Sequence, residues 1–171
     1  MIIEERVERS QYVKLITWIV SFIILMAGIE FPVLILWVNQ DMMSKVIGAS
    51  VLCLIFFTLI FTVAYQPRKL ILSETHIIME RILGQVYISY SDITDISLYH
   101  RENVAEIRIF GIGGLGGYIG KFYNSKIGFY TAYVGDYSQA FLIKINNREK
   151  YVMSCRHAEK IVEEVKSRLK Q

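Results

Sequence analysis

The chain has few cysteines and histidines, and almost no surplus of one charge. Only two cysteines occur in 171 residues: Cys53 lies inside an apolar run and Cys155 near the C-terminus. A disulfide between segments of such different character is not expected, and a reducing compartment fits. The three histidines share no metal-ligand spacing, so we expect no metal site. The net charge is only +3 and no basic stripe stands out, so we expect no nucleic-acid partner.

Residue patterns that carry catalysis are also missing. No serine lies in a nucleophile elbow, and no acidic pair is set for general acid–base work. The one nucleotide-like motif, GxGxxG from Gly111 to Gly116, follows a strand, but no helical pattern opens after it. We therefore expect no catalytic residue, no bound cofactor and no enzymatic activity.

Apolar residues make up 53% of the chain and are concentrated between Leu15 and Tyr65. The run over residues 46–65 contains no charge and no proline. Twenty helical residues extend about 30 Å, the thickness of the hydrocarbon core of a bilayer. Soluble core helices are rarely apolar on every face over such a length. This run predicts a transmembrane helix.

A second, earlier run over residues 15–38 is also long enough to span, although Glu30 and Pro32 interrupt it. Residues 39–45 leave room only for a short external loop, so the two helices form an antiparallel hairpin. Lys and Arg collect on the cytoplasmic side of membrane proteins. Here they lie where the chain enters the first helix and where it leaves the second. The connecting loop contains Lys45 as its one basic residue. We expect a multi-pass protein of the cytoplasmic membrane with both termini in the cytosol, residues 1–14 forming a cytosolic segment.

Glu30 has two interpretations. Ionisable residues inside membrane spans are often functional. The alternative gives Glu30 no function: its side chain snorkels to the outer interface of the membrane, and Pro32 already breaks the helix there. In a regular hairpin, Glu30 should face Ser50 or Cys53 on the second helix, as an intramembrane polar contact.

Residues 66–171 have the pattern of a separate cytosolic domain. Short alternating segments between turn residues predict about seven or eight antiparallel strands. Apolar residues from Ala158 to Leu169 then fall at helical spacing, with Ser154 as a plausible N-cap. The fold class is α+β: a two-helix transmembrane hairpin, then an antiparallel β domain closed by an amphipathic helix.

Three stretches resemble a known family. They are Arg108-Ile109-Phe110-Gly111 with the glycines through Gly120 and Phe122, then Gly128-Phe129-Tyr130-Thr131, and the ending Tyr151-Val152-Met153-Ser154 that leads into the helix. Over residues 66–171 the chain resembles the bacterial PH-like (pleckstrin-homology-like) domains found beside transmembrane hairpins in membrane proteins of uncharacterised function. The resemblance implies a PH-like fold and no catalytic residues.

The glycine-rich stretch from Gly111 to Gly120 has two interpretations. Its glycines permit a sharp loop or a bulged crossing between sheets. Alternatively, it is a contact surface for the bilayer or a partner, because apolar, aromatic and basic residues gather there. The candidate contact residues are Leu115, Tyr118, Ile119, Lys121, Phe122, Tyr123 and Lys126.

In lipid-binding PH-like domains, basic residues cluster around the first hairpin loop. Here that loop is Ser73-Glu74-Thr75, which is not basic, so we do not expect phosphoinositide binding. The sequence favours a non-enzymatic, membrane-tethered module that binds a protein partner or its own copies beside the lipid bilayer. The alternative is an accessory subunit of a transporter or envelope complex that acts through its hairpin. A membrane enzyme is a third hypothesis.

Overall fold

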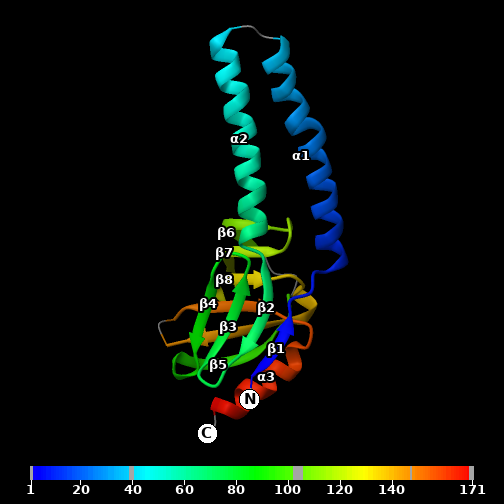
Figure 1. The fold of residues 1–171 in the computed structure, drawn as a ribbon. Coiled ribbons are helices and arrows are strands. Elements are labelled where there is room, and N and C mark those ends of the chain that lie inside the picture. Colours follow the sequence, from blue (N-terminus) through cyan, green and yellow to red (C-terminus); the bar gives the residue numbers. More distant parts are fainter. Residues whose placement is uncertain (1, 39–40, 102–105, 147, 170–171) are drawn as a thin grey trace.

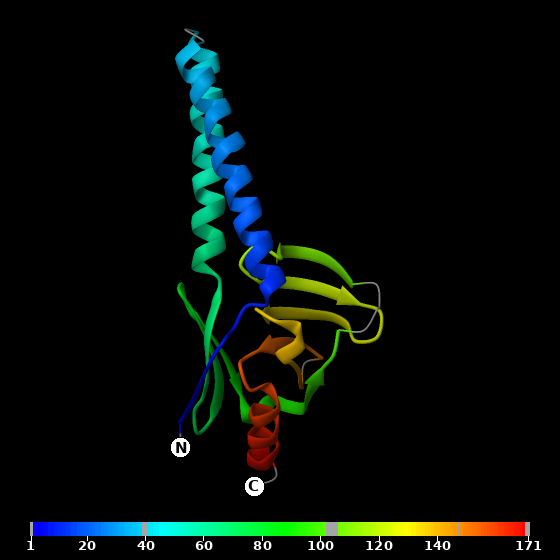
Figure 2. The ribbon, with the colours of Figure 1, turned by 90° about the vertical axis from the view of Figure 1, so that its right-hand side faces the viewer.

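A computed structural model describes residues 2–38, 41–101, 106–146 and 148–169. A long helical hairpin stands on a domain built from two sheets and one further helix (Figures 1 and 2). In chain order the elements are β1 (Ile3–Arg6), α1 (Gln11–Val38), α2 (Met42–Ala64), β2 (Pro67–Leu72), β3 (His76–Arg81), β4 (Gln85–Ser89), η1 (Tyr90–Asp92), β5 (Ile93–Tyr99), β6 (Glu106–Gly113), β7 (Tyr118–Asn124), β8 (Gly128–Val134), η2 (Tyr137–Gln139), β9 (Ala140–Ile145), β10 (Lys150–Ser154) and α3 (Ala158–Leu169).

Both predicted N-terminal helices are present, and each begins four residues early. The Val13 backbone N–H donates to the Ser10 hydroxyl at 3.2 Å, so α1 begins before its apolar run. Asp41 caps α2 in the same way through the Ser44 N–H at 2.9 Å. The idea that Pro32 breaks the first helix is wrong, since α1 continues to Val38. Among the described residues, only α2 is a helix long and apolar enough to cross a membrane.

The N-terminal segment contributes a strand to the first sheet. Its β1 pairs with β2 in antiparallel register, with Ile3 opposite Leu72 and Arg6 opposite Lys69. Sequence patterning missed this strand because it is only four residues long and three of them are charged. The strands on either side of the helical hairpin are therefore neighbours in one sheet.

The strands form two sheets, ordered β1-β2-β3-β4 and β5-β9-β10-β8-β7-β6. The prediction of seven or eight antiparallel strands is wrong in two respects. The part of residues 66–171 that the structure describes contains nine strands, and β10 pairs with β8 in parallel. The long connection through η2 and β9 returns the chain beside β8 and permits this parallel pair.

The glycine-rich stretch is mostly strand, and only residues 114–117 form the turn between β6 and β7. Gly111 faces Gly120 across the pair, with φ of +117° and +123°. The two backbones approach so closely that a Cβ on either glycine would meet the opposite carbonyl oxygen, of Ile119 or Phe110. Glycine is therefore required at both positions for the two strands to pair. The sequence predicted a loop here, and the structure has a β-hairpin instead.

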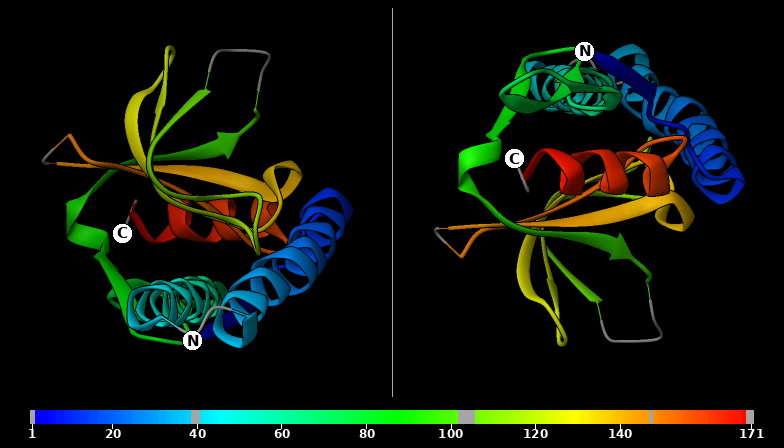
Figure 3. Two further views of the ribbon diagram at one scale, coloured as in Figure 1. Left: turned by 90° about the horizontal axis from the view of Figure 1, so that it is seen from above. Right: turned by 90° about the horizontal axis from the view of Figure 1, so that it is seen from below.

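The main core lies between the two sheets and is closed by α3, which is seen between them from below (Figure 3). Leu70, Ile77 and Phe141 are fully buried there, and Ile161 and Val165 contribute the apolar face of α3. Ser154 is not the N-cap of this helix, which begins at Ala158. It ends β10, and its buried hydroxyl accepts the Gly135 N–H at 2.9 Å.

Candidate functional site

The exposed surface of β6, β7 and β8 has two adjoining rows of side chains. The register places Ile107, Tyr123 and Phe129 in one row. Phe110, Lys121 and Thr131 form the next row, which continues to Tyr151 on β10. Residues directly opposite one another in a sheet share a face, so all seven lie on one side of it. We call this surface the β6–β8 face.

Large apolar side chains are exposed on the β6–β8 face. Phe110 and Phe129 are 72% and 68% exposed, and Ile107 is also exposed. The Tyr123 and Phe129 rings pack edge to face, with centroids 5.0 Å apart. The strand β6 ends the six-stranded sheet, and a bulge between Arg108 and Phe110 bends it. Such an exposed apolar edge strand is typical of an interaction site.

A groove of about 490 Å³ lies on this face, lined by residues of β6, β7, β8 and β10. Its cationic side chains are Lys121, Arg148 and Lys150, with Glu149 as the acidic member. Glu149 accepts the Tyr151 hydroxyl at 3.0 Å. Burial and this carboxylate raise the pKa of Tyr151 to about 12, so it remains a neutral donor. The groove therefore has apolar walls and a basic balance.

The seven residues predicted as a contact surface do not lie together on the outside. Ile119 and Phe122 are buried, so their side chains pack inside the domain in this structure. Tyr118 and Leu115 are half-buried, and the Arg101 guanidinium lies 5.2 Å from the Tyr118 ring centre. Lys121 and Lys126 are exposed and Tyr123 is half-buried. For these last three the surface role stays a prediction, and Phe129 and Phe110 extend the set.

The opposite face of β6–β8 carries a closed polar cluster that the sequence did not disclose. The Glu106 side chain, 5% exposed, lies 2.6 Å from Arg101 and accepts hydroxyl hydrogen bonds from Tyr130 and Tyr137. Burial and the neighbouring carboxylate raise the pKa of Tyr137 well above its usual range. Arg101 also stacks over Tyr137 at 4.7 Å. The two tyrosine hydrogen bonds to Glu106 and its ion pair with Arg101 give the cluster the chemistry of a structural tie.

The predicted intramembrane polar contact joins Glu30 with Ser50 or Cys53. Glu30 and Cys53 are exposed on their helices, and the Ser50 hydroxyl donates to the Val46 carbonyl at 2.8 Å. Among the described residues, no hydrogen bond joins Glu30 to either candidate. The pairing stays a prediction.

A family model for the bacterial PH domain matches residues 68–169, which is more than half of the chain. The chain belongs to the bacterial PH domain family. No curated protein and no solved structure matches it. The matched region begins in β2 and ends with α3, so the hairpin and β1 lie outside it.

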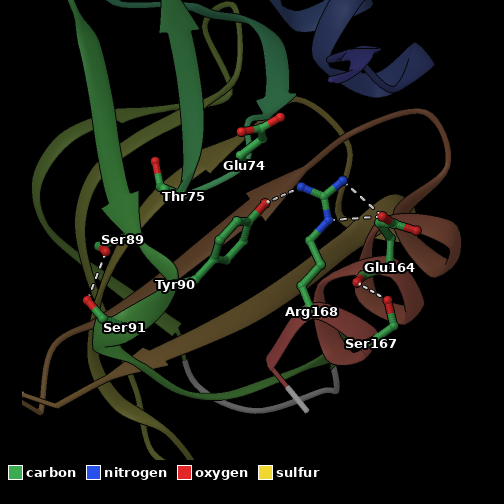
Figure 4. A pocket seen from close by; sticks show the side chains of 8 residues that line it. All are labelled: Glu74, Thr75, Ser89, Tyr90, Ser91, Glu164, Ser167 and Arg168. Carbon is green, nitrogen blue, oxygen red and sulfur yellow. Dashed lines mark hydrogen bonds and ion pairs between the residues drawn. The ribbon is translucent and has the colours of Figure 1, made fainter. Parts of the chain in front are cut away.

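The first hairpin loop of this bacterial PH domain lies at the end of β2 remote from α2 (Figure 1). Six strand residues separate the helix end from Ser73, a distance of about 20 Å. A hollow beside the loop is lined by Glu74, Tyr90, Glu164 and Arg168 (Figure 4). Arg168 lies 2.9 Å from Glu164 and donates to the Ser73 carbonyl at 2.5 Å.

This hollow is poorly suited to a phosphoinositide headgroup. Its arginine is engaged with a carboxylate and with the loop backbone, and a second carboxylate, Glu74, lines the same wall. A multiply charged phosphate would therefore meet two acidic groups. Arg168 instead ties the last turn of α3 to the first hairpin and to the Tyr90 hydroxyl at 3.3 Å.

No group of three potential metal ligands occurs among the described residues. His157 lies 3.0 Å from Glu5, which ties the N-terminal strand to the start of α3. Cys155 is buried, and burial raises the pKa of its thiol to about 12, far from that of a nucleophilic thiolate. The glycine-rich stretch leads into β7 rather than a helix, so it lacks the helix N-terminus that a dinucleotide needs.

Proposed function

We propose that this chain is a non-enzymatic, membrane-tethered bacterial PH domain that holds a protein partner, or further copies of itself, at the cytoplasmic membrane surface. The observation that carries the proposal is the exposed apolar β6–β8 face with its basic groove. PH domains are in general binding modules, and an apolar face beside a membrane anchor is suited to a partner held at the same surface.

Two observations support the proposed membrane tether: the length of α2 and the pairing of β1 with β2. A helix of 23 residues extends about 34 Å, enough for the hydrocarbon core. Because β1 and β2 are neighbouring strands, the chain must leave and re-enter on the same side of any membrane that α2 crosses. A crossing by α2 therefore requires a return crossing, and the 28 residues of α1 are long enough for it. The flanking Arg and Lys residues favour the cytosol for that side.

The proposed partner presents an extended apolar segment with carboxylates nearby. The outer edge of β6 is unpaired within the described residues, so an added strand finds free backbone groups there. Phe110 and Ile107 would contact its apolar side chains, and Lys121 its carboxylates. Neither contact needs a phosphoinositide or a cofactor.

Site-specific photo-crosslinking tests this proposal. With p-benzoylphenylalanine in place of Phe129, we expect an adduct with a protein in native membranes, or an adduct of twice the 19.8 kDa chain mass if copies associate. The matched control is Tyr87, a similarly exposed aromatic residue outside the β6–β8 face, on β4. Protein adducts that are absent at Phe129, or equally strong at Tyr87, would overturn the proposal.

A further inference from the structure

The turn between β3 and β4 is hydrogen-bonded to the end of the membrane helix. The Leu83 backbone N–H donates to the Ala64 carbonyl at 2.8 Å, one of the last carbonyls of α2. Figure 1 shows the β3–β4 turn beside the base of this helix. Since α2 is only slightly longer than the hydrocarbon core is thick, its last turn lies at the level of the lipid headgroups. The hydrogen bond to Ala64 therefore keeps Leu83 close to the level of the lipid headgroups.

Two large aliphatic side chains project from this turn. Ile82 and Leu83 are 50% and 58% exposed. The turn is tight, because the Arg81 N–H donates to the Gly84 carbonyl at 3.2 Å and Gly84 has φ of +79°. Polar residues usually occupy such a turn in water. Two exposed aliphatic residues fit an environment that is itself partly apolar.

Arginine and tyrosine surround the turn, as is usual at a membrane interface. The Arg81 guanidinium lies 5.2 Å from the centre of the Tyr65 ring, at the end of α2, and 5.6 Å from that of Tyr133. Arg68 is exposed nearby at the start of β2. Glu80, the acidic residue of this hairpin, lies at the same end of β3, opposite Lys69 of β2 and Gln85 of β4, so two arginines and one lysine there oppose one carboxylate. The rim is therefore basic and aromatic, which suits anionic lipid headgroups.

A second contact fixes the domain against the other helix. The Gly116 N–H, in the β6–β7 turn, donates to the Thr17 hydroxyl of α1 at 2.8 Å. Buried Gln66 also accepts a hydrogen bond from Arg9 at 2.5 Å, between the two helix bases. Because the domain is held at both helices, the β3–β4 turn has little freedom to swing away from the bilayer.

We propose that the β3–β4 turn is a second membrane contact, in which Ile82 and Leu83 insert at the boundary between headgroups and acyl chains of the bilayer that α2 spans. The contact fixes the tilt of the domain and hence the direction of the β6–β8 face. This inference rests on the proposed tether. The occupant is the anionic bilayer itself, because the hydrogen bond to Ala64 places the turn there and its rim is basic.

Spin-label accessibility tests the contact. Single cysteines replace Leu83, Tyr87 and Phe57 in the full chain carrying Cys53→Ser and Cys155→Ala, reconstituted in vesicles of phosphatidylcholine and phosphatidylglycerol in equal proportions. Tyr87 is the matched control, because it is 60% exposed in the same hairpin and lies about 13 Å further along β4. Phe57 is exposed on α2 and reports the tether.

We expect the ratio of oxygen to water-soluble nickel accessibility to be at least about threefold higher at Leu83 than at Tyr87. Equal ratios at these two sites, with a lipid-like ratio at Phe57, would overturn the contact and leave the tether standing. An aqueous ratio at Phe57 would overturn both.

A second variant keeps the native cysteines, in case their replacement disturbs folding. With Trp18 and Trp37 changed to phenylalanine, Leu83→Trp should be quenched by lipids brominated near the headgroup, and Tyr87→Trp should not. Equal quenching at both positions would contradict the insertion of Leu83.

Discussion

Glu106→Ala should lower the free energy of unfolding by about 3–5 kcal/mol, measured by urea unfolding of the full chain in mild detergent. The substitution removes the common acceptor of the Tyr130 and Tyr137 hydroxyls and the ionic partner of Arg101. Tyr130 is buried, so its hydroxyl would lose a partner that water replaces poorly. Most of the expected loss comes from these tyrosines, because Arg101 is itself partly exposed.

Glu149→Ala is the matched control for this prediction. Glu149 also accepts a tyrosine hydroxyl, from Tyr151 at 3.0 Å, but it is exposed. Water can replace the lost bond, so the expected change is within about 1 kcal/mol. If the Glu106 and Glu149 variants unfold at the same urea concentration, the cluster on β6–β8 is not the tie that we describe.

Gly120→Ala should lower the free energy of unfolding by about 3 kcal/mol or more, because it forces a side chain into the β6–β7 pair. Gly120 has φ of +123°, a conformation that alanine adopts only under strain. Its Cβ would meet the Phe110 carbonyl oxygen, which is backbone and cannot rotate away. The same urea titration measures the effect, and loss of the hairpin should also weaken crosslinking from Phe129.

Gly113→Ala provides the comparison within the same hairpin. Gly113 has no positive φ, and the nearest atom to a Cβ there is Arg108 Nη1 at 3.4 Å, the end of a flexible side chain. We expect a change within about 1 kcal/mol. A Gly113 variant as unstable as the Gly120 variant would show that any side chain in this stretch is harmful, and that close backbone approach is not the cause.

The hydrophobic pattern of the sequence was sufficient to predict those elements whose residues are contiguous in the chain. The uniformly apolar run predicted α2, and the spacing of Ile161, Val162 and Val165 predicted the buried face of α3. The PH-like resemblance over residues 66–171 is confirmed by the family match over residues 68–169. In each case the information lies within one element or one contiguous region.

Patterning failed where a partner lies far away in sequence. The strand β1 is short and charged, and only its pairing with β2, more than sixty residues later, makes it a strand. The strand β7 contains Gly120, a residue type that is depleted in strands, and its pairing with Gly111 of β6 explains why glycine is needed there. The Glu106 cluster joins side chains from β6, β8 and η2, which no spacing rule connects.

The turn at Leu83 and Gly84 illustrates both cases. Gly84 is one of the turn residues that separate the alternating segments in the sequence, and the structure has a turn there between β3 and β4. The exposure of Ile82 and the hydrogen bond from Leu83 to Ala64 depend on the length of the hairpin and the direction of β2. Those are properties of the assembled domain, so only the structure brings the turn to the base of α2.

The proposed function requires that the chain crosses the membrane twice and keeps its PH domain in the cytosol. Cysteine labelling in spheroplasts with a membrane-impermeant maleimide tests it most directly, using single cysteines in the Cys53→Ser, Cys155→Ala chain. Met42, exposed at the start of α2, and Tyr87, exposed on β4, are the two informative positions. Our account predicts that Met42→Cys is labelled in intact spheroplasts and Tyr87→Cys only after permeabilisation. Labelling of Tyr87→Cys in intact spheroplasts, or protection of Met42→Cys there, would contradict it.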